Sequence, residues 1–125
     1  MKRKRLMIID DDKEFLEELN ETLSLSGYDL VAVNDANQAL KIALETRPAV
    51  ILTDLKMPRK SGFQLAEEFK RRSELREIPI MAMSAFYKDG DFPLMKIYGI
   101  ETCLNKPFTP EALICEIEKV LKEEK

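Results

Sequence analysis

The sequence predicts an α/β fold with a five-stranded parallel sheet that is doubly wound, a (βα)5 arrangement. Two observations carry this prediction. Five short apolar runs alternate with five segments of helical periodicity, and the first run, residues 6–9, is continuous and stops at acids. Continuous apolar runs are typical of parallel strands buried on both faces. A length of 125 residues suits one domain, so we expect a single domain over residues 1–125.

The first part of the chain predicts two strands, each followed by a helix. Residues 6–9 form the first apolar run and residues 28–33 the second. Between them, residues 13–26 carry apolar side chains every four residues and end before a glycine, which is typical of an amphipathic helix. Asp35 begins a pattern that resembles a capping box, which predicts a second helix that runs to Thr46.

The middle of the chain predicts two further strands. Residues 49–53 form the third apolar run and residues 80–83 the fourth. The third strand is followed by a loop with proline and glycine, residues 56–62, which leads into a helix with Leu65 and Phe69 on its inward side. Because strands and helices keep alternating, all strands should run in the same direction.

The last part of the chain predicts the fifth strand between two helices. A glycine and a proline limit the fourth helix to about residues 92–98. Residues 102–104 form a short fifth strand, and Thr109 caps a final helix with Pro110 at its first position. The inward side of this helix carries four aliphatic residues: Leu113, Ile117, Val120 and Leu121.

The composition excludes several classes of function. The 20 basic and 23 acidic residues give a net charge of −3, whereas nucleic-acid binding needs a basic surplus. The basic run at residues 2–5 is expected to be a solvated end of the chain. The sequence contains no histidine, which excludes histidine-based zinc sites and histidine-dependent triads. Cys103 and Cys115 are too few for a disulfide framework and read as small apolar residues.

The sequence also predicts a cytoplasmic protein without membrane contact. No apolar stretch approaches the roughly 20 residues that span a bilayer. The N-terminus lacks the pattern of a signal peptide, because only four apolar residues follow the basic run before three aspartates.

Polar residues follow four of the five predicted strands, at the carboxyl end of each. They are Asp10, Asp11, Asp12, Asp54, Ser84 and Lys106. Ligands of open parallel sheets bind at this edge, where the strand order reverses. Each residue alone has an ordinary explanation: Asp11 or Asp12 could cap the first helix, and Asp54 could form a turn. Polar residues after four strands at the same edge of the sheet favour a functional site over four separate ordinary explanations.

The chemistry of these side chains suits phosphoryl transfer with a magnesium ion. Crowded carboxylates bind protons or a cation, and oxygen donors favour Mg²⁺, with Mn²⁺ or Ca²⁺ as substitutes. Asp10, Asp11 and Asp54 carry −3, which Mg²⁺ and Lys106 together neutralise. A carboxylate can serve as the nucleophile and form an aspartyl phosphate. A glycine-rich phosphate loop is missing from the sequence, so we do not expect direct use of a nucleotide.

Five segments carry a resemblance to a known family. They are Ile8-Ile9-Asp10-Asp11-Asp12, Leu52-Thr53-Asp54-Leu55-Lys56-Met57-Pro58, Ser61-Gly62, Met83-Ser84-Ala85 and Lys106-Pro107-Phe108. In order and spacing they resemble the response-regulator receiver domain of two-component signalling, from about Leu6 to Leu121. The resemblance implies the flavodoxin-like strand order 2-1-3-4-5 of chemotaxis regulators, and one receiver domain over residues 1–125.

The resemblance also implies a role for each carboxylate. Asp54 would accept phosphate from a phosphohistidine on a sensor histidine kinase or a histidine phosphotransfer protein. Asp11, Asp54 and the backbone carbonyl of Lys56 would bind Mg²⁺, and Asp10 would act mainly through water. Apart from catalysing its own phosphorylation and dephosphorylation, such a domain is a signalling module and not an enzyme.

Two further residues would contact the phosphoryl group. By resemblance, Ser84 would donate a hydrogen bond to it and Lys106 would pair with it, and the bond between Lys106 and Pro107 would be cis. Phosphorylation would change the surface made by the fourth helix, the fifth strand and the last helix, toward an unidentified downstream effector. We expect a monomer or a weak dimer, with no nucleic acid bound by this domain.

Two alternative functions stay open, and the first of them follows from a departure from the family pattern. Cys103 stands where the family usually has an aromatic residue whose inward swing reports phosphorylation. A receiver-like interaction module that works without phosphorylation is therefore one alternative. A hydrolase of the haloacid-dehalogenase type is another, although Lys56 occupies the position of its second acid.

Two side chains are expected near the line along which water would attack the phosphoryl group. Lys56 and Phe86 each lie two residues beyond a site residue, and the resemblance implies that these positions tune dephosphorylation. A bulky apolar Phe86 cannot activate water, which predicts a comparatively long-lived phosphorylated form.

Overall fold

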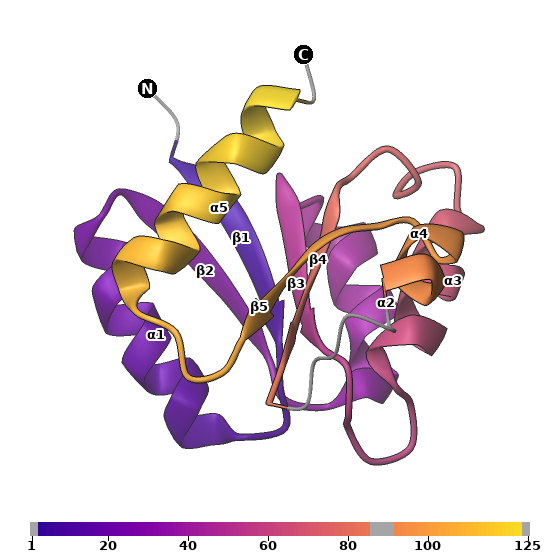
Figure 1. The fold of residues 1–125 in the computed structure, drawn as a ribbon, viewed down its shortest axis with the longest axis horizontal. Coiled ribbons are helices and arrows are strands. Elements are labelled where there is room, and N and C mark those ends of the chain that lie inside the picture. The colour runs from indigo at the N-terminus through magenta and orange to yellow at the C-terminus, as the bar shows by residue number, and fades with distance from the viewer. Residues whose placement is uncertain (1–2, 86–91, 124–125) are drawn as a thin grey trace.

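The computed structural model describes residues 3–85 and 92–123, in which strands and helices alternate along the chain (Figure 1). The strands are β1 (Lys4–Ile9), β2 (Tyr28–Val33), β3 (Val50–Asp54), β4 (Ile80–Ser84) and β5 (Ile100–Asn105). The helices are α1 (Lys13–Leu25), α2 (Ala36–Thr46), α3 (Gly62–Lys70), α4 (Phe92–Ile97) and α5 (Pro110–Glu123). Among the helices of these residues, none has the length and apolarity needed to cross a membrane.

The five strands form one parallel sheet in the order β2-β1-β3-β4-β5, which confirms the predicted fold class and strand order. Helices α1 and α5 cover one face of the sheet, and α2, α3 and α4 cover the other (Figure 1). The order reverses between β1 and β3, so the carboxyl ends of these two strands flank the place where such sheets bind ligands.

The core consists of one apolar cluster on each face of the sheet. In β1, Leu6 and Ile8 belong to the cluster beneath α1 and α5, whereas Met7 and Ile9 belong to the cluster beneath α2 and α3. Successive side chains of a strand point to opposite faces. Both faces of β1 are covered, and this is why its apolar run is continuous.

Two strands extend beyond their apolar runs by two residues or more. The first strand begins at Lys4, two residues before the predicted start, and the fifth covers Ile100–Asn105 in place of 102–104. Lys4 pairs with Tyr28 of β2, and Asn105 pairs with Ser84 of β4. Backbone pairing continues into polar and exposed positions, where side-chain hydropathy gives no signal.

Residues 3–5 of the basic run are exposed, as expected, but two of their side chains also bind helix ends. Arg3 donates from its Nη2 to the carbonyl of Ser24, at 2.6 Å, and pairs with Asp29. Arg5 donates to the carbonyl of Thr46 at 2.7 Å. These carbonyls belong to the last turns of α1 and α2. Backbone carbonyls in the last turn of a helix have no N–H donor within that helix. The two arginines therefore fasten both helices to the start of β1.

Candidate functional site

The carboxyl edge of the sheet brings together residues that are far apart in the sequence. Asp10 directly follows β1, Asp54 and Ser84 end β3 and β4, and Lys106 directly follows β5. Asp10 is 1% exposed and Ser84 is 4% exposed, whereas Asp54 and Lys106 are half-buried and Asp11 is exposed. Asp10 and Ser84 are thus the buried part of the predicted site, whereas solvent reaches Asp11, Asp54 and Lys106.

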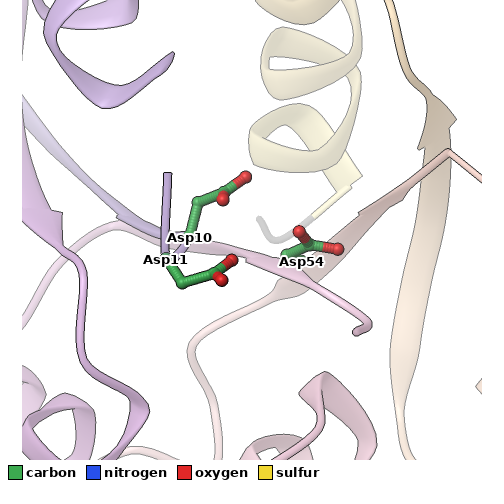
Figure 2. Close-up of side chains that lie close together, drawn as sticks. All are labelled: Asp10, Asp11 and Asp54. Carbon is green, nitrogen blue, oxygen red and sulfur yellow. The ribbon is translucent and has the colours of Figure 1, made fainter. Parts of the chain in front are cut away.

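Three carboxylates form the centre of the site (Figure 2). One carboxylate oxygen each from Asp10, Asp11 and Asp54 lies within 4.8 Å of the other two. Asp10 and Asp11 extend from the end of β1 toward Asp54 at the end of β3. The strand ends on either side of the switch point therefore supply all three acids.

Asp12 has a different role from its two neighbours. Its carboxylate accepts a hydrogen bond from the backbone N–H of Phe15 at 3.2 Å and caps α1. Its own N–H donates to Oδ1 of Asp10 at 2.9 Å. The sequence left open whether Asp11 or Asp12 caps this helix. Asp12 is the cap, and Asp11 belongs to the carboxylate cluster.

Lys106 joins the two less exposed carboxylates. Its Nζ donates to Oδ2 of Asp10 at 2.5 Å and to Oδ2 of Asp54 at 3.2 Å. The backbone holds the lysine in this place, because its N–H donates to the carbonyl of Ser84 at 3.0 Å. The bond between Lys106 and Pro107 is cis, as the resemblance implied.

The charges of Asp10 and Lys106 depend on each other. Burial raises the pKa of Asp10, although hydrogen bonds from Lys106 and Asp12 act in the opposite direction. Burial would lower the pKa of Lys106, but the hydrogen bond and charge of Asp10, with those of Asp54, outweigh it and raise this pKa. A buried carboxylate is costly, and the adjacent ammonium offsets part of that cost.

The start of α3 lies directly against the end of β3. The N–H of Gly62 donates to the carbonyl of Leu55 at 3.0 Å, and a Cβ atom on Gly62 would overlap the backbone carbonyl oxygen of Asp54. Ser61 and Gln64 form a reciprocal capping box at the same helix start. The sequence showed Ser61-Gly62 only as part of a motif, and this close approach is the physical reason for the glycine.

The loop after β3 also orients the carboxylate of Asp54. The backbone N–H of Lys56 donates to Oδ1 of Asp54 at 3.2 Å, while the Lys56 side chain is exposed. Cys103 is half-buried in β5 and packs against the cluster beneath α2 and α3. Phe86, the other residue expected near the phosphoryl group, lies outside the described residues.

Two aromatic residues that sequence reasoning did not assign to the site lie beside Lys106. Its Nζ is 4.5 Å from the centroid of the Phe15 ring. Phe108 packs edge-on against Phe15, with ring centroids 5.9 Å apart and an angle of 80° between the planes. Phe108 belongs to the motif Lys106-Pro107-Phe108, which contributed to the family resemblance. Phe15 carried no signal beyond its place in the apolar pattern of a helix.

The carboxylate cluster suits a small divalent cation. Its donors are oxygens, which Mg²⁺ prefers, and an octahedral ion with bonds of about 2.1 Å needs ligand oxygens roughly 3–4 Å apart. The selected carboxylate oxygens of Asp10, Asp11 and Asp54 are at most 4.8 Å apart, which is close to this range. Small side-chain movements or a bridging water would bring Asp10, Asp11 and Asp54 into range.

Comparisons with known proteins agree with this geometry. Residues 6–118 match the family model of the response regulator receiver domain. The polar-differentiation response regulator DivK of Brucella anthropi is 31% identical over 118 residues, which cover 94% of this chain and 96% of DivK.

Solved structures give the same result. The chemotaxis protein CheY4 of Vibrio cholerae has a TM-score of 0.89 at 26% identity, covering 94% of this chain and 98% of that one. A sensor protein from a Polaromonas species has a TM-score of 0.90 at 27% identity, and the match covers 98% of this chain and 99% of that one.

Proposed function

The chain belongs to the response regulator receiver domain family, and on this premise we propose that it is a phosphoacceptor switch. Asp54 takes phosphate from a phosphohistidine on a sensor histidine kinase or a histidine phosphotransfer protein. The observation that supports this proposal is the cluster of Asp10, Asp11 and Asp54, two of which share the ammonium of Lys106.

In the proposed step, an oxygen of Asp54 attacks the phosphorus atom. The bond between phosphorus and the donor imidazole nitrogen breaks, and its electron pair returns to that nitrogen. The product is an aspartyl phosphate on this chain and a free histidine on the donor. Oδ1 of Asp54 accepts a hydrogen bond from Lys56, while Oδ2 accepts one from Lys106. Both contacts orient the nucleophile before the donor arrives.

The other residues of the site stabilise charge. Asp11, Asp54 and the backbone carbonyl of Lys56 would hold Mg²⁺, with Asp10 acting mainly through water. When bound, this ion would neutralise carboxylate and phosphoryl oxygens. Lys106 would turn from Asp54 toward a phosphoryl oxygen, and the hydroxyl of Ser84 would donate a hydrogen bond to another. Most of the catalysis of such a transfer comes from position and charge.

The consequence of phosphorylation would be a change at the surface formed by α4, β5 and α5, where a downstream effector binds. The kinases that supply phosphohistidine take their phosphate from ATP, so we assign the exchange to the cytoplasm. The domain would act as a monomer or weak dimer, on protein partners and not on nucleic acid or membranes.

One observation favours a second candidate, a receiver-like module that binds partners without phosphorylation. Cys103 is half-buried in β5, at the position where the family usually carries its switching aromatic residue. A thiol is too small to replace the swing of a ring. If the module works in this way, partner binding will be the same with and without phosphate on Asp54.

Incubation with acetyl phosphate and Mg²⁺, followed by intact mass measurement, tests the main proposal. Wild type should gain one phosphoryl group, which hydroxylamine removes, and Asp54→Asn should gain none. Asp12→Asn is the matched control, because asparagine caps helices as well as aspartate does, and it should be phosphorylated like wild type. Phosphorylation of Asp54→Asn at the wild-type rate would show that the acceptor is a different residue.

A further inference from the structure

The ammonium of Lys106 has a third neighbour besides the two carboxylates. Nζ of Lys106 lies over the face of the Phe15 ring, 4.5 Å from the ring centroid. A cation within about 6 Å of the centroid is attracted to the electron-rich face of an aromatic ring. Lys106 retains only 21% side-chain exposure, so solvent weakens this attraction less than it would at an open surface.

The position of the Phe15 ring is set from two sides. Phe15 lies in the first turn of α1 and packs against the apolar cluster beneath α1 and α5. Phe108, two residues beyond Lys106, meets the ring edge-on with a centroid distance of 5.9 Å. The segment after β5 therefore supplies both Lys106 and Phe108, the ring that packs against Phe15.

An aromatic face and a carboxylate restrain an ammonium differently. A hydrogen bond to Oδ2 of Asp54 defines one direction, whereas the attraction of a ring face varies little as the charge moves across it. Under the proposed function, Lys106 must leave Asp54 and follow the negative charge onto a phosphoryl oxygen. The ring can hold Nζ within the site throughout this movement.

We infer that Phe15 is a positioning residue for phosphoryl transfer, acting through Lys106. Its ring keeps the ammonium over the site and excludes water from one side, and it leaves the ammonium able to move from Asp54 to the incoming group. This inference rests on the proposed function. It adds a residue of α1 to a site otherwise built from strand ends and their loops.

The test measures the rate of phosphorylation by acetyl phosphate at saturating Mg²⁺, because a small donor does not require protein docking on α1. Phe15→Leu keeps an apolar side chain but removes the ring face. It should slow phosphorylation about tenfold, which corresponds to about 1.4 kcal/mol. Phe15→Tyr keeps the face and should stay within about twofold of wild type. Mg²⁺ affinity should be unchanged in both variants.

A double-mutant cycle separates this role from a loss of packing. In a Lys106→Met background, Phe15→Leu should cause no further slowing. Phe63→Leu is the matched control, because Phe63 also packs on another ring, that of Tyr98 at 5.4 Å, but belongs to the cluster beneath α2 and α3, on the opposite face of the sheet from Phe15. It should leave the rate within about twofold of wild type.

A spectroscopic measurement tests the contact itself. The ring current of Phe15 should shift the NMR signals of the Lys106 side chain, and the shift should disappear in Phe15→Leu and persist in Phe15→Tyr. Equal slowing by Phe15→Leu with and without Lys106, or wild-type rates in Phe15→Leu, would overturn the inference while the phosphoacceptor role stands. A wild-type protein that takes no phosphate would overturn the proposed function and the inference together.

Discussion

The first residue of α3, Gly62, lies so close to the backbone carbonyl of Asp54 that no side chain fits between them. The N–H of Gly62 donates to the carbonyl of the adjacent Leu55 at 3.0 Å. The end of β3 and the start of α3 are therefore in direct backbone contact next to Asp54, and any residue with a Cβ at position 62 must separate them.

Gly62→Ala should destabilise the fold by about 1–3 kcal/mol, the usual cost of forcing extra atoms into a packed place. It should also weaken Mg²⁺ binding, since Asp54 must shift. Urea denaturation and a metal titration measure the two effects. Gly27→Ala is the control: Gly27 has a φ of +92° and open space around its Cβ position, so it should lower stability through backbone strain and leave Mg²⁺ affinity unchanged. Equal Mg²⁺ affinity in Gly62→Ala and wild type would contradict the close approach.

Mg²⁺ should stabilise the protein by binding the folded form only, by about 2.7 kcal/mol at one hundred times the dissociation constant. Asp11→Asn should abolish most of this gain while leaving the metal-free protein as stable as wild type or more so, because one charge leaves a repelling cluster. Melting temperatures with Mg²⁺ and with EDTA measure both effects. Asp12→Asn, outside the cluster, should keep the full gain. A wild-type melting temperature indifferent to saturating Mg²⁺ would count against the site.

Tyr28 should titrate at a higher pH than a free tyrosine. Burial raises its pKa above 10.0, as do the charge of Glu118 and the hydrogen bond to it. Between pH 10.0 and this raised pKa, the folded chain holds a proton that the unfolded chain has lost. The stability that Tyr28 contributes is therefore complete below this window and declines as the pH rises through it.

The absorbance of tyrosinate, taken as the difference between wild type and Tyr28→Phe, measures this titration. Glu118→Gln should move the midpoint down toward the ordinary value but not all the way, because burial is the largest cause of the shift. A midpoint unaffected by Glu118→Gln would show that the carboxylate does not act on the phenol.

Arg5→Met should destabilise the protein by about 1 kcal/mol, the typical net value of one hydrogen bond. The reason is that Thr46, at the end of α2, loses the donor that satisfies its carbonyl. Lys4→Met is a matched control on the neighbouring exposed position, and surface changes of this kind usually alter stability by less than about 0.5 kcal/mol. Urea midpoints distinguish the two. If both variants behaved alike, the guanidinium would not be fastening the helix.

The sheet could be predicted from the sequence alone, because short apolar runs that alternate with helical patterns are typical of buried parallel strands. The sequence was also sufficient to collect Asp10, Asp54, Ser84 and Lys106 at one edge, since each follows a strand. The contact between Lys106 and the Phe15 ring could not be predicted. In the sequence, Phe15 resembles any other apolar residue of α1, and the contact depends on the orientation of this helix on the sheet. Gly62 was visible as a motif, but its closeness to Asp54 is a property of packing.

The hydrogen bonds of Arg3 and Arg5 reach less far along the chain than those of Lys106. At the amino end, Arg3 meets Ser24 across 21 residues and Arg5 meets Thr46 across 41. At the carboxyl end, Lys106 meets Asp10 across 96 residues. Contacts between distant residues cost more loop entropy and form later than local ones. During synthesis, the partners of Arg3 and Arg5 are therefore made long before Lys106 is. Asp10 and Asp54, in contrast, can pair with Lys106 only after β5 has been synthesised, so a chain that ends before β5 lacks the ammonium of the candidate site.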